Sequence, residues 1–165
     1  MREIGIGVIG TAFMGKAHSI AYASAGTAFG GNLRPRLEMV CDQNPQIAEA
    51  KRAEMGFARC TTNYMDVIND PKVELISICV PNSIHKEIAI AALAAGKHVW
   101  CEKPMSTNLA DSQAMVDAAA ASEQKTIVGY NYTQNPLVHA ARDMINEGVI
   151  GKVTGFFGVY DVDNE

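Results

Sequence analysis

The sequence lacks a long apolar run, a cluster of basic residues and an aromatic-rich basic face. A membrane-spanning helix needs about 20 consecutive apolar residues, so we expect no membrane partner. Nucleic acid is excluded on the same kind of ground, because phosphate binding needs clustered lysine and arginine and the net charge here is −4. The start, Met1-Arg2-Glu3, leads directly into an apolar segment broken by glycines, which is not the pattern of a secretory signal.

Cysteine pairs at metal-binding or redox spacing are also missing. The four cysteines, Cys41, Cys60, Cys79 and Cys101, form no Cys-x-x-Cys motif, and several fall in predicted strands, where cysteine behaves as a small buried hydrophobe. We therefore expect no disulfide, no metal site and a cytoplasmic location, since thiols persist in a reducing compartment.

What is present is a regular alternation of apolar strands and helices. A chain of 165 residues with 48% hydrophobic and 19% charged residues is long enough to form a globular domain with its own core. Alternating strands and helices predict an α/β fold with a doubly wound parallel sheet, the Rossmann fold. We expect strands at 4–9, 37–41, 57–61, 73–80, 97–101 and 126–130, helices at 16–24, 45–55, 64–68, 84–95, 108–122 and 137–147, and a surface loop at 25–35.

The first strand ends in the glycine-containing turn Gly10-Thr11-Ala12-Phe13-Met14-Gly15, and a helix follows. Strand, glycine turn and helix together are the context of a dinucleotide-binding fingerprint. Gly10 would make the turn and Gly15 would let the helix pack close to the strand. The middle glycine, which lets the backbone approach a pyrophosphate, is replaced by Ala12, so the motif alone is only suggestive.

The same turn has an alternative interpretation as a nucleoside-triphosphate-binding loop. A Walker A motif requires serine or threonine after its lysine, to hold magnesium. Here Lys16 is followed by Ala17. That residue excludes the nucleoside-triphosphatase interpretation.

Asp42 follows the second predicted strand. A carboxylate at this position can accept the protons of a ribose 2′-hydroxyl and repel a 2′-phosphate, which favours NAD. As an alternative, Asp42 could cap helix 45–55, although Asn44-Pro45 already supplies a cap and a first-turn proline. NADP stays open, because Arg34 or Arg36 could reach a 2′-phosphate if their loop folded back.

The most informative stretch is 96–108, in which a short apolar strand ends in Glu102-Lys103-Pro104. Ligands of parallel sheets lie beyond the carboxyl ends of the strands. Ionised side chains are expensive to bury without partners, and the proline biases Lys103 toward an extended backbone. Taken alone, the tripeptide is better interpreted as a solvated strand end with a turn proline; the segments that precede it favour a functional site.

Several separate motifs resemble one family, the superfamily of glucose-fructose oxidoreductase and inositol dehydrogenase (Gfo/Idh/MocA type). The matching segments, in order and across the whole chain, are Gly10-x-Ala12-x-x-Gly15-x-x-His18, Val80-Pro81-Asn82-x-x-His85, Ala95-Gly96-Lys97-His98-Val99-x-Cys101-Glu102-Lys103-Pro104, Gly129-Tyr130-Asn131-Tyr132-x-x-x-Pro136 and Gly148-x-Ile150-Gly151-Lys152-Val153.

The resemblance implies an NAD(P)-dependent oxidoreductase that moves a hydride between a carbinol carbon of a sugar or cyclitol and the nicotinamide. It implies that Lys103 is catalytic, beside the nicotinamide, and that the Lys103-Pro104 bond is cis. His18 is expected to be structural, and His98 a satisfied core or edge histidine. The residues expected to bind the cofactor are Gly10, Thr11, Ala12, Phe13, Met14, Asp42, Val80, Pro81, Asn82, His85, Glu102, Lys103 and Asn131.

Members of this family carry a second, substrate-holding domain that supplies the general base. We expect residues 1–150 to be the nucleotide-binding domain and 151–165 the first strand of that absent domain, so that the chain is a truncated form with little turnover. The same superfamily leaves two alternatives, an NAD-dependent glycosidase and a non-catalytic nucleotide-sensing module. Apolar residues in the last strand, left without their sheet, predict a homo-oligomer: Val153, Phe156, Phe157, Val159 and Tyr160.

Overall fold

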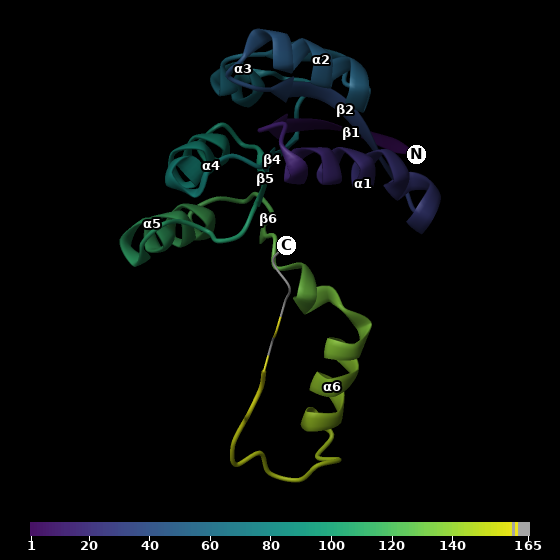
Figure 1. Cartoon of the computed structure of the whole chain (residues 1–165), viewed down its shortest axis with the longest axis vertical. Helices are drawn as coiled ribbons and strands as arrows, with labels where there is room; N and C mark the ends of the chain where they lie inside the picture. Colours follow the sequence, from purple (N-terminus) through teal and green to yellow (C-terminus); the bar gives the residue numbers. More distant parts are fainter. Residues whose placement is uncertain (160, 162–165) are drawn as a thin grey trace. The chain divides into compact units, whose positions relative to one another are not determined.

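Six parallel strands form one sheet in the order β3-β2-β1-β4-β5-β6 (Figure 1), within a computed structural model that describes residues 1–159 and 161. The doubly wound parallel fold expected from the sequence is confirmed. Each crossover between successive strands contains a helix, as a parallel sheet requires. The strands are β1 (Arg2–Ile9), β2 (Leu33–Cys41), β3 (Arg59–Thr61), β4 (Leu75–Ile78), β5 (His98–Cys101) and β6 (Thr126–Val128).

Helices cover both faces of this sheet, and each face has its own core. Ile76 and Ile78 of β4 face a cluster completed by Ile88 of the α4 helix. Val8 of β1 faces the other way, toward Phe57 and Tyr22. Strands buried on both faces read as continuous apolar runs, which is why they were visible in the sequence. The helices of this unit are α1 (Phe13–Phe29), α2 (Pro45–Met55), α3 (Tyr64–Asn69), α4 (His85–Ala94) and α5 (Leu109–Ala120).

The cap expected at Asn44 is confirmed, because its side chain accepts hydrogen bonds from two backbone N–H groups at the start of α2. Asn108 caps α5 by accepting from one backbone N–H, that of Asp111. Ser83 and Asn82 cap nothing: a 3₁₀ turn, η1 (Asn82–Ile84), leads into α4 without a side-chain cap. A preceding turn of 3₁₀ helix can satisfy the first orphan N–H groups instead.

The expected loop at 25–35 is wrong. Helix α1 continues to Phe29, and β2 already begins at Leu33. A single glycine such as Gly26 is tolerated in a helix, whereas the pair Gly30-Gly31, with φ of 65° and 91°, ends it. Pro35 lies within β2, where β3 does not reach, since β3 pairs only with Met39–Cys41. Proline is tolerated along such a free edge.

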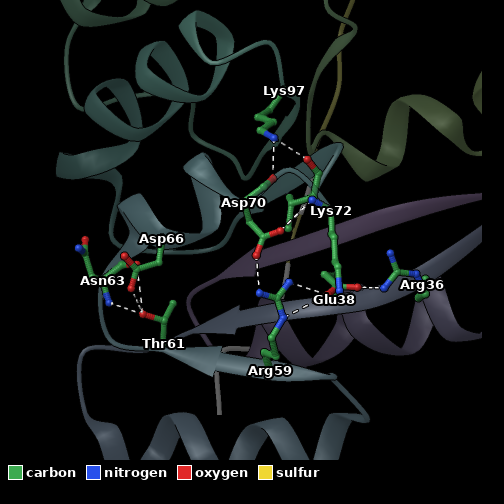
Figure 2. A network of polar contacts seen from close by, with 10 residues as sticks. Arg36, Glu38, Arg59, Thr61, Asn63, Asp66, Asp70, Lys72 and Lys97 are labelled. Carbon is green, nitrogen blue, oxygen red and sulfur yellow. Dashed lines mark hydrogen bonds and ion pairs between the residues drawn. The ribbon is translucent and has the colours of Figure 1, made fainter.

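Near the edge of the sheet that carries β3, a buried carboxylate on β2 takes part in a network of ion pairs (Figure 2). The Glu38 side chain is 2% exposed and forms ion pairs with both Arg36 and Arg59. Arg59 Nη1 also lies 2.5 Å from Asp70 Oδ2, at the end of α3. A buried carboxylate needs such partners, because an unpaired buried charge is costly. The arginine thus links β2, β3 and α3.

Lys97, just before β5, extends this network with main-chain contacts. Its ammonium is buried and donates to the carbonyl oxygens of Asp70 and Val73, at 2.8 and 2.7 Å (Figure 2). These carbonyls belong to the connection between α3 and β4. The lysine of the Gly96-Lys97-His98 motif is therefore structural, since it satisfies buried oxygens that no strand pairs.

Residues Tyr130–Glu165 form a second unit, with a 3₁₀ turn, η2 (Asn131–Gln134), and one helix, α6 (Pro136–Asn146). In the segment expected to form the last strand, Phe156 and Phe157 are each 94% exposed. The described residues 152–159 form no strand. The expectation that they begin a second sheet stays a prediction, and Tyr160 lies outside the described residues. None of the helices in the described part of the chain is both long and apolar enough to cross a bilayer.

Candidate functional site

A cleft of about 720 Å³ lies at the carboxyl ends of β1, β2 and β4. Its volume is within the range of roughly 300–1,000 Å³ typical of small-molecule sites. In an open parallel sheet this edge is where ligands bind, at the point where the strand order reverses. The cleft is lined by Ile9, Gly10, Thr11, Ala12, Cys41, Asp42, Gln43, Thr62, Asn63, Tyr64, Cys79, Val80, Pro81, Ser83, Ile84 and Ile88.

Gly10 makes the turn at the floor of the cleft. Its φ is +97°, and a Cβ atom there would stand 2.4 Å from the carbonyl oxygen of Cys79, so no other residue fits without displacing backbone. Ala12 precedes α1 with no side-chain cap, and the first turn of α1 contains no acidic residue. The first N–H groups of the helix are therefore available to an anion. This turn fits a pyrophosphate even with alanine at its middle position.

Asp42 also lines the cleft, where two hydrogen bonds fix its carboxylate. Its Oδ2 atom accepts a hydrogen bond from the Thr11 hydroxyl, and its Oδ1 atom accepts from the Asn44 N–H at 3.0 Å. A carboxylate has about four acceptor positions, so these two contacts leave room for two ribose hydroxyls. Because Asn44 performs the capping, the alternative that Asp42 caps α2 is wrong.

The two arginines considered for a 2′-phosphate lie elsewhere. Both belong to the beginning of β2, where they pair in register with Glu3 and Gly5 of β1. Arg36 is held by ion pairs to Glu3 and Glu38. Six residues of extended strand, roughly 20 Å, separate Arg36 from the Asp42 end of β2. A strand in place of the expected loop removes this route to NADP.

Lys103 follows β5, whose end lies next to the end of β4 in the sheet. Its side chain is exposed, and among the contacts of the described residues its ammonium has no partner. The preceding Glu102 is instead buried, at 6% exposure, and its Oε2 atom accepts from the Lys103 N–H at 3.3 Å. The peptide bond to Pro104 is cis, as expected.

His18 is a residue whose part the sequence analysis missed. It was expected to pack within the first helix, but its Nε2 atom lies 2.9 Å from Glu102 Oε1, across the sheet from α1 to β5. Its other nitrogen lies 3.1 Å from Ser77 Oγ. The signal in the sequence was its place in the glycine motif, three residues after Gly15, which put it on the buried face of α1. His98, by contrast, accepts from the Lys125 N–H at 3.0 Å and is the satisfied histidine that was expected.

His85 has a part different from the expected one. Its ring has no exposed surface, and its two nitrogens lie 2.8 Å from the Val80 carbonyl and 3.1 Å from the Pro104 carbonyl. The side chain therefore ties the end of β4 to the segment after Lys103. It holds the walls of the site together and does not line it.

The remaining expected residues are distributed as follows. Val80 and Pro81 line the cleft. Phe13 is 82% exposed at the start of α1. Met14 and Asn82 are half-buried. They do not belong to the lining of the cleft, but each lies within two positions in the sequence of a residue that does. Asn131 is exposed and belongs to the second unit, Tyr130–Glu165.

Five residues that line the cleft were not predicted from the sequence. Thr62, Asn63 and Tyr64 follow β3 and begin α3, while Ile84 and Ile88 come from the start of α4. The two isoleucines are four residues apart, so they share one face of the helix. This spacing, together with the end of a third parallel strand, was the available signal.

Two cysteine thiols line the cleft without being reactive. Burial, helped by the nearby carboxylate of Asp42 for Cys41 and of Glu102 for Cys79, raises the pKa of both thiols to about 12. A thiol with this pKa stays protonated at neutral pH, so it is a poor nucleophile. These residues are packing elements of the site.

Comparison with known proteins gives a consistent result. The chain is 38% identical over 161 residues to levoglucosan dehydrogenase from Pseudarthrobacter phenanthrenivorans, a match covering 97% of this chain and 41% of that protein. It is 31% identical over 149 residues to inositol 2-dehydrogenase/D-chiro-inositol 3-dehydrogenase from Lactiplantibacillus plantarum, covering 89% and 41%. The chain thus spans about two fifths of the length of these relatives.

Solved structures agree with the sequences. Levoglucosan dehydrogenase in complex with NADH and levoglucosan superposes with a TM-score of 0.88 at 38% identity, covering 92% of this chain and 41% of that one. Residues 4–130 match the family described as an oxidoreductase family with an NAD-binding Rossmann fold. The chain therefore belongs to the Gfo/Idh/MocA oxidoreductase family and contains its NAD-binding Rossmann portion.

Proposed function

We propose that the protein is an NAD-dependent oxidoreductase that transfers a hydride between a carbinol carbon of a sugar or cyclitol and the nicotinamide. The observation that carries the proposal is one sheet edge bearing the Gly10 turn, the fixed Asp42 carboxylate and, two strands along, the exposed Lys103. Family membership and the levoglucosan and inositol dehydrogenases among its relatives support this substrate class.

The cofactor would lie along the cleft, with each group meeting residues of suitable chemistry. The N–H groups that begin α1 would hold the pyrophosphate, and Asp42 would accept the hydroxyl protons of the adenosine ribose. Ile84 and Ile88 offer an apolar wall for the adenine. When bound, the nicotinamide supplies the hydride chemistry.

Lys103 would act on the substrate oxygen. A lysine ammonium is a compact donor, and its charge stabilises negative charge that develops on an alkoxide. Its exposure beyond the carboxyl end of β5 leaves it free to reach a substrate. We further propose that Asn131, from the second unit, contacts bound ligand, an expectation that rests on the family motif.

Titration of the 165-residue chain with NADH and NADPH, followed by nicotinamide fluorescence, tests the cofactor part. We expect NADH to bind more tightly than NADPH. Asp42→Ala should narrow the difference because it removes the charge that repels a 2′-phosphate. Asp117→Asn, on the outside of α5, is a matched control that should leave both affinities unchanged. Equal affinity of the unchanged chain for both nucleotides would contradict the assignment.

Turnover of the full-length protein tests the reaction. A panel of sugars and cyclitols with NAD should raise absorbance at 340 nm, and Lys103→Met should lower kcat by roughly 10²–10³, the range for the loss of one donor to a developing oxyanion. Aryl-glycoside cleavage without net change at 340 nm would instead indicate a glycosidase. Tight NADH binding with no turnover on any polyol would indicate a sensing module.

Self-association and location are further proposals. The exposed Phe156 and Phe157 support a homo-oligomer, because contiguous exposed apolar residues mark interaction surfaces. Light scattering that gives a monomer, with a tail resistant to proteolysis, would contradict it. Four free cysteines are in keeping with a cytoplasmic protein.

A further inference from the structure

A buried chain of hydrogen bonds runs beneath the exposed Lys103. Tyr22 Oη lies 2.7 Å from Ser77 Oγ, which lies 3.1 Å from His18 Nδ1. His18 Nε2 lies 2.9 Å from Glu102 Oε1, and Glu102 Oε2 accepts from the Lys103 N–H. The chain therefore connects α1, β4 and the end of β5, and it ends on the backbone of the proposed catalytic residue.

The proton positions in this chain follow from its ends. An ionised carboxylate only accepts, so His18 Nε2 must carry a proton and donate to Glu102. The Tyr22 hydroxyl is the other end: burial raises its pKa to about 12, so it keeps its proton at neutral pH.

Two protonation states of His18 remain, neutral and cationic, and they differ in the hydrogen bonds that Ser77 makes. If the Tyr22 hydroxyl donates to Ser77, Ser77 donates to His18 Nδ1, and every proton has an acceptor with His18 neutral. If His18 were cationic, its Nδ1–H would donate to Ser77, and only one of the Ser77 and Tyr22 hydroxyl protons could be used in the contact between these two residues. The other hydroxyl proton would then have no acceptor among the contacts of the described residues. An unpaired buried donor is costly, so the neutral arrangement is favoured.

Packing holds the Glu102 carboxylate in this one place. Glu102 and His18 are 6% and 7% exposed, and the Trp100 ring meets the His18 ring edge-on, with centroids 4.9 Å apart. On the other side, a Cβ atom at Gly129 would stand 2.4 Å from Glu102 Oε1. The carboxylate is thus packed closely against both the His18 imidazole and the backbone after β6.

We propose that His18 is a positioning residue: as the neutral tautomer protonated on Nε2, it fixes the Glu102 carboxylate, which in turn fixes the peptide from which the Lys103 side chain extends. The part that Lys103 plays rests on the proposed function. The hydrogen-bond chain itself does not, because it exists in the protein without cofactor.

Two substitutions separate the contacts of His18. In His18→Gln, the amide nitrogen takes the place of Nε2 and can still donate to Glu102. In His18→Asn, the shorter amide takes the place of Nδ1, so it keeps Ser77 and loses Glu102. His98→Asn is a matched control, because His98 is a half-buried histidine at the other end of β5 whose Nδ1 acceptor asparagine can replace.

Nitrogen NMR of the cofactor-free chain tests the tautomer. We expect His18 Nε2 to carry the proton and Nδ1 to resonate as an unprotonated acceptor at pH 7. The amide proton of Lys103 should resonate downfield, as an amide bonded to a carboxylate does, in the unchanged chain, in His18→Gln and in His98→Asn. It should move upfield in His18→Asn and in Glu102→Gln.

NADH affinity tests the consequence for the site. His18→Asn should weaken binding roughly tenfold, the order expected for one lost hydrogen bond to a charged group, while His18→Gln and His98→Asn should stay near the unchanged value. A doubly protonated His18 ring, a proton on Nδ1 alone, or an unmoved Lys103 amide in His18→Asn would overturn the proposal, as would equal affinities of the Asn and Gln variants. If the unchanged chain failed to bind NADH, the proposed function would fail, and the NMR comparison would still decide the positioning.

Discussion

Two glycines in the same helix should respond oppositely to alanine. At Gly15, a Cβ atom would stand 2.0 Å from the carbonyl oxygen of Gly10 and 3.0 Å from its carbonyl carbon. Both neighbours are backbone atoms of the Gly10 turn, so neither can swing aside. At Gly26, the Cβ atom would meet only Arg34 Cγ, at 3.7 Å, an ordinary contact.

The magnitudes follow from these distances. Relief at residue 15 requires α1 to move about 1 Å away from the end of β1, and overpacking of this kind costs about 1–3 kcal/mol or more. For a chain of this length, 3 kcal/mol corresponds to a fall of roughly 6–12 °C in Tm. Gly26→Ala removes a flexible residue from a helix interior and should stabilise by about 0.5–1 kcal/mol.

Calorimetry and NADH titration together test this reasoning. Gly15→Ala should lower Tm and also abolish most NADH binding, because the helix start moves with its N–H groups. Gly26→Ala should raise Tm by a few degrees and leave affinity unchanged. A Gly15→Ala protein with unchanged Tm and affinity would refute the idea that close contact between helix and turn builds the site.

Three further outcomes are expected. Lys97→Met should destabilise the chain by about 1–3 kcal/mol in urea unfolding, because the Val73 carbonyl oxygen loses the lysine donor, while the Asp70 carbonyl keeps the Val73 N–H. Unchanged stability would remove Lys97 from the network. The hydrogen bond from Arg59 lowers the pKa of Asp70 below its ordinary 3.8. The ionised Asp70 carboxylate therefore contributes fully to the free energy of unfolding above pH 3.8, and this contribution is lost as the pH falls through the lowered pKa. In Asp70→Asn, this part of the acid sensitivity should disappear from urea unfolding midpoints measured between pH 5 and 2. Burial raises the pKa of Cys79 and Cys101 to about 12, so alkylation of the folded chain at pH 8, followed by mass spectrometry, should be slow at both. Rapid labelling of either thiol would show that its surroundings open to solvent.

The sequence predicted the order of elements well because a parallel sheet is buried on both faces. Apolar runs such as Ile4–Ile9 cannot be surface segments, and Asn44-Pro45 carries its capping chemistry locally. Boundaries that depend on pairing were less accessible. Pro35 indicates a loop to any local rule, yet it lies within β2 because the neighbouring β3 is short.

In the site too, residues marked by a local signal could be predicted, and residues whose partners are distant in the sequence could not. Gly10, Asp42 and Lys103 follow strands directly, and strand ends can be located from apolar periodicity. His18 and His85 could not be assigned, because their partners are 84 residues away at Glu102 and 19 residues away at the Pro104 carbonyl. A histidine carries no local mark that distinguishes a ligand contact from a buried hydrogen bond to the main chain.

The hydrogen bond from Thr11 to Asp42 has a consequence for attempts to redirect the cofactor preference. Thr11 is 5% exposed, so a neutral apolar residue at position 42 would strand its hydroxyl without an acceptor, at a cost of about 1–3 kcal/mol. Protein engineers who replace the acid alone would thus weaken the fold while they remove the barrier to a 2′-phosphate. The two positions are best exchanged as a pair.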